Sequence, residues 1–386
     1  ATLNIELTDD DGSALIRTDR LPMPVARCLL AVATRRAPTA WPTELDGDRG
    51  ELQQLDVRWQ RLDDATAPFT LRADARGLGA RLPALQVSVA DISGELTGAS
   101  GSWSFVPAAT QPVTLAYRSS QSAAAERPNE VVTLEGKLSV TNPQASAAAL
   151  QLEQLVVRAA ATTMQIDGDV SLLAGGPILL TVSAAGADAV VTRDVLARLA
   201  PDSTLVKALS PLQGGRLAQA DLLLHGVRDP DGTFQIDRER SQLTAEVTAL
   251  DWQVDGLDAP LRGSNATVSL LRGDVVIALQ GGRSEGVELE RGRWELPAEG
   301  AGRVAIRART QLDSGWLGRR WPVLAATGTA GNAVIDLQAA LGIDDSVVSQ
   351  WRGTVRLNDA SVSLAGALPT IAGVRGTVEF VDQRPT

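Results

Sequence analysis

The sequence predicts a mainly β protein, an elongated antiparallel sheet with a few short helices. Apolar and polar residues alternate with period two along most of the 386 residues. Glycine and proline punctuate these alternating runs at positions that favour turns. Strands with one apolar and one polar face are typical of antiparallel sheets, whereas buried parallel strands are apolar on both faces.

The alternation is clearest in four stretches, and each is predicted to be a strand: residues 134–140, 178–182, 275–279 and 335–343. The sequences Asp-Pro-Asp-Gly at 229–232 and Arg-Gly-Asp at 272–274 are typical of a tight turn and a hairpin tip. Residues 3–7 already alternate like a strand inside a sheet. We therefore expect the chain to be a piece of a longer protein.

Helical spacing of apolar residues is confined to three stretches. Residues 24–36 carry apolar side chains at this spacing. A second helix is predicted at 192–199, with Thr192 as its N-cap and Pro201 after its end. Residues 204–209 add a further turn or two. These helices interrupt what is otherwise a succession of strands.

An internal repeat is predicted from two shared patterns. The pattern G-x-[LV]-x-x-x-D begins at Gly50, Gly215 and Gly353, and residues 71–78 and 243–250 share L-x-A-[DE]-[AV]-x-[GA]-L. Helical stretches precede the first two copies. The alternative is chance, because a glycine-led strand with a later Asp is common wherever hairpins abound.

A chain of this length exceeds the roughly 250–300 residues at which single cores stop growing. We interpret it as a series of repeats. Four segments are predicted: 1–20 as the end of a preceding repeat, 21–190 as the first repeat, 191–330 as the second, and 331–386 as a truncated third.

Composition excludes several function classes. The 46 acidic and 36 basic residues give a net charge of −10, which argues against nucleic-acid binding. A single histidine, His225, and a single cysteine, Cys28, leave no set for a zinc site or a disulfide. No run approaches the roughly 18 apolar residues of a membrane-spanning helix.

No catalytic motif is present either. We interpret His225 as the end of a strand, Cys28 as a small apolar residue on a helix, and the acidic residues 8–12 as a solvated turn. No pair of carboxylates has a spacing diagnostic of hydrolysis. The sequence therefore predicts a protein that is not an enzyme and needs no cofactor or metal.

Four features together resemble a known family. They are the helix 192–209 leading into 214–226, the turn 229–234, the strand 243–252 followed by 261–263, and residues 353–364 followed by 373–380. They are similar to the AsmA-like envelope proteins related to TamB, within them to YhdP-like members, over roughly residues 20–380. The family often has Pro-Phe where this chain has Gly-Thr-Phe at 232–234.

The resemblance implies a long, curled sheet that forms an elongated groove with an apolar inner face. It implies a periplasmic location, with the parent protein anchored in the bacterial inner membrane. The expected function is a bridge-like path for phospholipid between the inner and outer membranes, reached through parts of the parent outside this chain. The expected groove lining, taken from the apolar positions of the alternating strands, is Leu134, Leu138, Ile178, Leu180, Val182, Ile335, Leu337, Leu341, Val355, Val362 and Leu364.

Two other functions stay open from the residues alone. The first is a structural or adhesive β-repeat envelope protein with a dry core and no lipid. The second is a polysaccharide hydrolase on a β-scaffold, which would need paired acids facing one cleft. Alternation does not decide whether an apolar face meets another sheet, a helix or an acyl chain.

Overall fold

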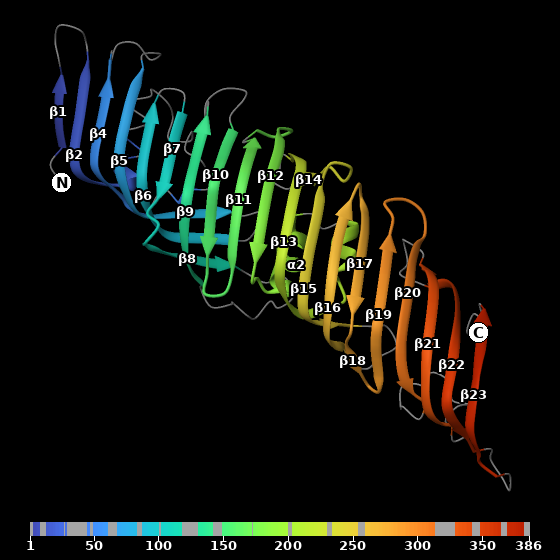
Figure 1. The fold of residues 1–386 in the computed structure, drawn as a ribbon. Coiled ribbons are helices and arrows are strands. Elements are labelled where there is room, and N and C mark those ends of the chain that lie inside the picture. The colour runs from blue at the N-terminus through green and yellow to red at the C-terminus, as the bar shows by residue number, and fades with distance from the viewer. Residues whose placement is uncertain are drawn as a thin grey trace. The chain divides into compact units, whose positions relative to one another are not determined.

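The computed structural model describes residues 3–7, 13–26, 28, 45–46, 49–60, 68–82, 87–99, 102–117, 130–141, 149–171, 173–199, 203–229, 234–253, 259–312, 329–341, 348–363 and 369–381. These residues form 23 strands of one antiparallel sheet and a few short helices (Figure 1). The prediction of a mainly β, antiparallel protein with few helices is confirmed.

The chain divides into two compact units. Unit 1 comprises Ala1–Ala185, Arg198–Ala200 and Leu223–Asp237, and unit 2 comprises Gly186–Ala197, Pro201–Leu222 and Arg238–Thr386. Strand β13 (Leu212–Arg228) contributes residues to both. The four-segment division expected from the sequence stays a prediction.

Unit 1 is a succession of strands that pair mostly with their neighbours in the chain. The pairing runs β1–β2–β4–β5–β6, and β6 then pairs with both β7 and β8. These two short strands both pair with β9, which continues through β10 and β11 to β12. The bounds are β1 Leu3–Leu7, β2 Ala14–Pro22, β3 Leu45–Asp46, β4 Glu51–Trp59, β5 Phe69–Leu82, β6 Val87–Ala99, β7 Ser102–Pro107, β8 Pro112–Tyr117, β9 Glu130–Thr141, β10 Ala149–Arg158, β11 Thr163–Ser171, β12 Pro177–Ala185 and β14 Phe234–Ile236.

Unit 2 repeats the same plan. Strand β13 pairs with β15, and β16 pairs with both β17 and the short β18. Both of these pair with β19, which continues through β20, β21 and β22 to β23. The bounds are β15 Gln242–Trp252, β16 Leu261–Leu271, β17 Asp274–Gln280, β18 Arg283–Ser284, β19 Val287–Leu296, β20 Gly302–Gln311, β21 Ala330–Leu341, β22 Val348–Val362 and β23 Ile371–Val381.

The hairpin tip expected at 272–274 is confirmed. Arg272 (φ 53°) and Gly273 (φ 82°) join β16 to β17, and two successive positive φ values are the signature of a type I′ turn. The turn expected at 229–232 lies largely outside the described residues.

Three hairpins share one bulge pattern, which supports the internal repeat. In β5–β6, β15–β16 and β22–β23 the register shifts twice, at equivalent positions. The first and second hairpins are related by a constant offset of 172 (249 − 77 and 263 − 91), and the second and third by 110 (359 − 249 and 373 − 263). The bulged residues with positive φ are Gly77, Ala249 and Asp359 on the first strand, and Asp91, Gly263 and Gly373 on the second.

The third copy of the glycine-led pattern was assigned to the wrong strand. Gly50 and Gly215 each lie against the bulge of the following hairpin: a Cβ on Gly50 would meet the Arg76 carbonyl oxygen at 2.7 Å. In the third set Gly331 occupies this place, since a Cβ there would meet the Ala360 Cα at 2.8 Å. Gly353 lies one strand later, in β22. The pattern missed Gly331 because Ala333 stands in place of its Leu or Val, and Leu337 in place of its Asp.

The helices lie where the sequence predicts them, but the residue that caps α2 differs from the prediction. Helix α2 (Ala189–Leu199) begins three residues before Thr192, because Asp188 caps it by accepting hydrogen bonds from Val190 N and Val191 N at 2.9 and 3.0 Å. The prediction of Thr192 as the cap is wrong. Helix α3 (Thr204–Ala208) is capped by Ser203, and residues 23–26 form a short helical turn. Most of the helix predicted at 24–36 lies outside the described residues.

Replacing Gly50 by alanine is expected to destabilise unit 1 by at least about 2 kcal/mol, because the new Cβ meets a carbonyl oxygen and φ is +93°. The matched control is Gly376→Ala, where a Cβ meets nothing within 4 Å and φ is unstrained. It should change stability by less than about 0.5 kcal/mol. Urea unfolding followed by tryptophan fluorescence measures both. Equal stability of the two variants would contradict the role given to this contact.

Candidate functional site

The candidate residues of unit 1 lie on one face of β9–β12. Residues that are register partners in antiparallel strands have their side chains on the same face. Leu138 of β9 pairs in this way with Leu152 of β10, and Ile166 of β11 pairs with Val182 of β12. We call this surface the β9–β12 face. Its side chains are Val132, Leu134, Leu138, Val140, Leu150, Leu152, Leu155, Val157, Met164, Ile166, Val170, Ile178, Leu180, Val182 and Ala184.

The opposite face of the same strands is mainly polar. Lys137 on β9 forms an ion pair with Glu153 on β10 at 3.0 Å, directly across the two strands. The apolar exceptions are Val131, Val156 and Leu179, of which Val131 is 61% and Leu179 41% exposed. The other side chains of this face include Thr133, Glu135, Ser139, Thr141, Gln151, Arg158, Thr163, Gln165, Asp167, Asp169, Thr181 and Ser183. The charged side chains that the structure describes on these four strands thus lie on one side, while Glu130, at the start of β9, has a side chain outside the described part.

Most of the β9–β12 face is half-buried. Ile178 is buried, at 2% exposure, whereas Leu134, Leu138, Leu180 and Val182 are each partly exposed to solvent. Side chains of neighbouring strands bury one another from the sides. A closely packed second layer over the face would bury them fully.

The candidate residues of unit 2 also share a face. Ile335 on β21 pairs with Ala308 on β20 and with Val355 on β22, and all three point to the same side of the sheet. Leu337 lies on this side and is half-buried. We call this surface the β20–β23 face. Its other side chains include Val304, Ile306, Ala333, Ala339, Leu357, Ala360, Val362, Ile371, Val374 and Val378.

The β20–β23 face is most open on β23. Ile371 and Val378 are 54% and 53% exposed, whereas Ala333 and Ala360 are buried. The backbone of Leu341 pairs with Gly302 in the register of this face, but its side chain lies outside the described part. Leu364 lies outside the described residues altogether.

Other parts of the apolar surface are closely packed. Val275, Ile277 and Leu279 of β17 are 0–1% exposed, and α3 packs against this strand. In unit 1, residues of β2, β4 and β5 form a buried cluster with Ala26 of the helical turn. We call these surfaces the β15–β17 face and the β2–β5 face.

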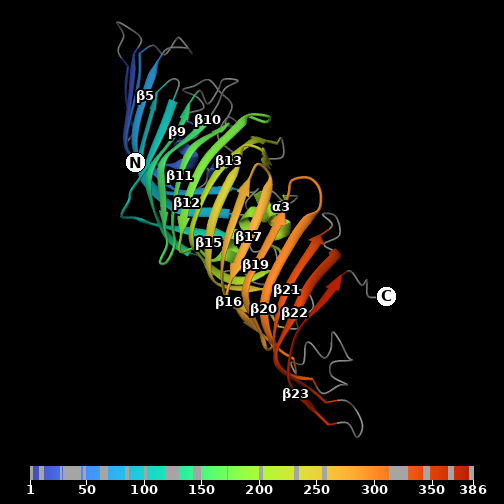
Figure 2. The ribbon, with the colours of Figure 1, turned by 45° about the vertical axis from the view of Figure 1, so that its right-hand side comes forward.

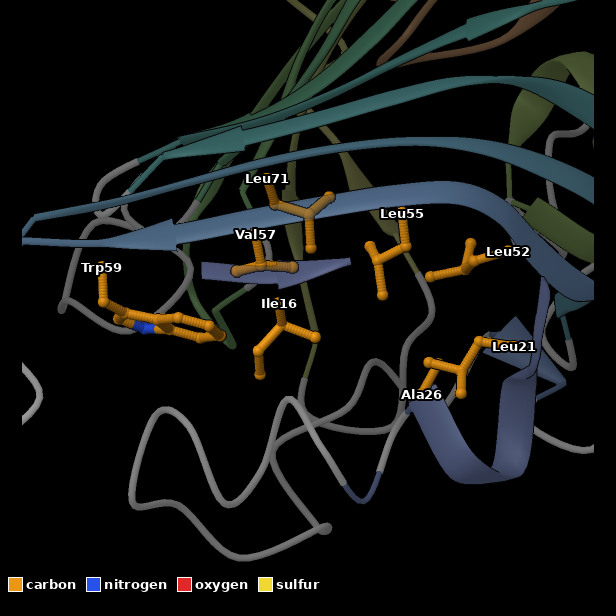
Figure 3. A pocket seen from close by; sticks show the side chains of 8 residues that line it. All are labelled: Ile16, Leu21, Ala26, Leu52, Leu55, Val57, Trp59 and Leu71. Atoms are coloured by element: carbon orange, nitrogen blue, oxygen red, sulfur yellow. The ribbon is translucent and has the colours of Figure 1, made fainter. Parts of the chain in front are cut away.

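The β2–β5 face encloses a small apolar cavity (Figure 3). Its free volume of about 10 Å³ is the space of a single water molecule, too small for a ligand. The side chains that point into it are Ile16, Leu21, Ala26, Leu52, Leu55, Val57, Trp59 and Leu71. This part of the apolar surface is therefore a dry core.

The residues singled out for chemistry do not gather into a site. Within the described residues, no group of three or more His, Cys, Asp and Glu side chains is placed to hold a metal ion. His225 is half-buried in β13. Cys28 is exposed, so its interpretation as an apolar helix residue is wrong: Met23 and Ala26 are the buried residues of this segment.

Arginines on the polar faces stabilise the ionised form of several carboxylates. Arg58 holds the pKa of Asp56 below its ordinary value, and Arg158 does the same for the pKa of Glu135, in each case chiefly by hydrogen bonding. The pKa of Glu290 is lowered by Arg309 first and by Arg307 as well. These pairs keep the polar faces charged and hydrated.

Comparisons with known proteins identify no relative: no family model, curated protein or solved structure matches the chain. The resemblance to AsmA-like proteins stays a prediction. No helix in the described part of the chain is long and apolar enough to cross a membrane. The proposed function therefore rests on the two half-buried faces, β9–β12 and β20–β23.

The loss of stability caused by a polar substitution should be small at a half-buried position and large at a closely packed one. Leu180→Asn is expected to cost about 1 kcal/mol or less, because the amide stays in contact with solvent. Ile277→Asn should cost about 3–5 kcal/mol, because it leaves a cavity and an unpaired amide in a buried site. Thr181→Asn, on the polar face, is the control. Denaturant unfolding of the three variants gives the comparison, and a loss at Leu180 as large as that at Ile277 would contradict the half-open surface.

Stability should fall in acid below about pH 4. Because the folded pKa values of Asp56, Glu135 and Glu290 are lowered, their contribution is complete above the unfolded pKa. It is lost as the pH falls through the lower folded values. Glu290→Gln should therefore flatten part of the decrease in melting temperature between pH 5 and pH 3, and high salt should flatten it further. A pH profile identical to that of the parent would contradict this assignment.

Proposed function

We propose that this chain is a segment of a bridge-like lipid-transfer protein, and that the β9–β12 and β20–β23 faces line a groove for phospholipid acyl chains. One observation carries the proposal: four adjacent strands carry an apolar face that is mostly half-buried, and every charged side chain that the structure describes on them lies on the other side. Contiguous exposed apolar surface of this kind marks an interaction site.

The energetics favour an acyl chain as the occupant. Each CH₂ group exposed to water costs about 0.8 kcal/mol, so drawing a two-chain lipid from a bilayer costs on the order of 20 kcal/mol. An apolar sheet face offsets much of that cost and is itself removed from water by the same contact. Among the described side chains of β9–β12, none that is charged lies on this face to oppose an apolar ligand.

The cellular setting of the proposal rests on the resemblance to AsmA-like proteins. We propose a periplasmic location for this segment, with the parent protein anchored in the inner membrane and phospholipid moving between the inner and outer membranes. The proposal includes no enzymatic step and no cofactor.

A structural or adhesive envelope protein is the alternative, and the packed β2–β5 and β15–β17 faces favour it. The same alternation there produces dry cores. In that case a further protein layer, rather than lipid, covers the half-buried faces in the parent protein. The two functions differ in what co-purifies: native mass spectrometry of the purified chain detects bound phospholipid only in the first.

Leu337→Asp tests the lipid path in the parent protein. The carboxylate places a charge on the half-buried face and should impose a barrier of several kcal/mol on a passing acyl chain. Lipid transfer should be lost, with the melting temperature nearly unchanged. The matched control is Gln338→Asp, on the polar face of the same strand, which should transfer normally.

Two results would contradict the lipid path at this position. Normal transfer by a folded Leu337→Asp variant would show that acyl chains do not pass there. A collapse of stability would instead indicate a dry, packed face, because an unpaired buried charge costs several kcal/mol.

A further inference from the structure

Helices α2 and α3 lie on one side of the sheet at β15–β17 (Figure 1 and Figure 2), and α3 packs against β17. Ala189 of α2 and Leu205 of α3 are buried, as is Leu209 just after α3. The helices turn the β15–β17 face into the most completely buried apolar surface of unit 2, and we call them the α2–α3 cover.

The strands beneath the cover carry many aliphatic side chains, as the half-buried β9–β12 face does. The β15–β17 face carries Leu243, Ala245, Val247, Leu250, Val268, Val275, Ile277 and Leu279, aliphatic side chains like those of the β9–β12 face. Their exposure is 0–8%. Trp252 and Trp294 also lie on this face with their ring centroids 6.2 Å apart, so these indoles and the packing of α3 against β17 together bury the aliphatic side chains.

Both ends of the cover are tied to β13. Before α2, Leu217 N donates to Ala187 O at 2.8 Å, and Gly186 N donates to Leu217 O at 2.7 Å. After α3, Leu212 N donates to Leu209 O at 3.0 Å. The cover is therefore hydrogen-bonded to β13 before α2, and a short turn joins the end of α3 directly to the start of β13.

Between the fixed ends, a polar latch holds α2 down. Arg193 donates to the Leu212 carbonyl oxygen of β13 and, through Nη2, to Asp194 Oδ1 at 2.8 Å. Arg193 and Asp194 are each only 6% exposed. A buried ion pair contributes little net stability, because water solvates both charges once they are released. Opening such a latch costs less than separating an equally large apolar contact.

We propose that the α2–α3 cover is a displaceable gate that competes with acyl chains for the β15–β17 face, with Arg193 and Asp194 as its latch. This inference rests on the proposed lipid path and adds its regulation. With the cover closed, lipid is excluded from β15–β17. With the cover displaced, the apolar surface of unit 2 continues from β15 through β19 and β20 to the β20–β23 face.

Two tryptophans of the chain can report whether the gate is open or closed. Trp252, on β15, is 4% exposed beside the α3–β13 connection, where Gln253 N donates to Pro211 O at 2.8 Å. Trp103, on β7, pairs with Val140 of the β9–β12 face and is half-buried. Two single-tryptophan versions of the full chain, each with the other seven of the eight tryptophans replaced by phenylalanine, report the two places separately.

Quenching by a phosphatidylcholine with brominated acyl chains, which requires contact with the indole, is the measurement. In the otherwise unchanged chain, Trp103 should be quenched and Trp252 should not. Arg193→Ala should make Trp252 accessible to quenching while Trp103 is unaffected. Leu205→Ser, which loosens α3 without altering the latch, should have the same effect.

A double variant provides the opposite control. Arg193→Met with Asp194→Leu replaces the latch by apolar side chains of similar size, an exchange that often preserves or raises stability. It should keep the cover closed and Trp252 protected. Circular dichroism establishes which variants are folded before quenching is compared.

The outcomes distinguish the gate from the lipid path. Quenching of Trp252 as strong as that of Trp103 in the unchanged chain would overturn the gate, as would full protection of Trp252 in folded Arg193→Ala and Leu205→Ser variants. If Trp103 is not quenched in any folded variant, the proposed lipid path itself fails.

Discussion

The segregation of apolar and polar side chains to opposite faces depends on a backbone device, the paired β-bulge. On β5 the apolar positions are Leu71, Ala73 and Ala75, and after the bulge at Gly77 they continue at Leu78. The alternation changes phase in the sequence, yet the face stays the same, because the bulged residue takes up the extra step. Without the bulge, every later side chain of the strand would point to the wrong side.

Two bulges of unit 1 each leave a backbone amide that the ladder does not use, and a side chain of the neighbouring strand supplies its acceptor. Gly77 N donates to Ser93 Oγ at 3.2 Å, and Gln154 N on β10 donates to Asp167 Oδ1 at 2.6 Å. Both acceptors stand at the same place relative to their bulge. A bulge with a side-chain acceptor thus occurs in two parts of unit 1. This recurrence indicates that the repeat preserves the assignment of side chains to the two faces more than it preserves particular residues.

Period-two alternation was sufficient to predict the strands and to place Leu134 with Leu138, and Ile178 with Leu180 and Val182, on one face of their strands, because side chains two residues apart lie on the same side. It could not predict burial: Leu180 and Ile277 alternate alike, but only Ile277 lies in a strand against which a helix packs. The third copy of the glycine-led pattern was placed on Gly353 rather than Gly331, because the structural marker of this place is a positive φ and a close backbone contact, which the residue pattern does not contain.

The composition of the half-buried face bears on what covers it. Protein–protein interfaces draw their binding energy from aromatic side chains and arginine, which fill shaped pockets. The β9–β12 face carries Val, Leu, Ile, Ala and a single Met, with neither an aromatic residue nor an arginine. Small and branched aliphatic side chains form a surface of low relief that holds no partner in one fixed register. An acyl chain needs no fixed register, since it gains from contact area alone and slides without breaking a directional bond. The same lack of specific anchors that would make this surface a poor protein interface suits it to a moving lipid.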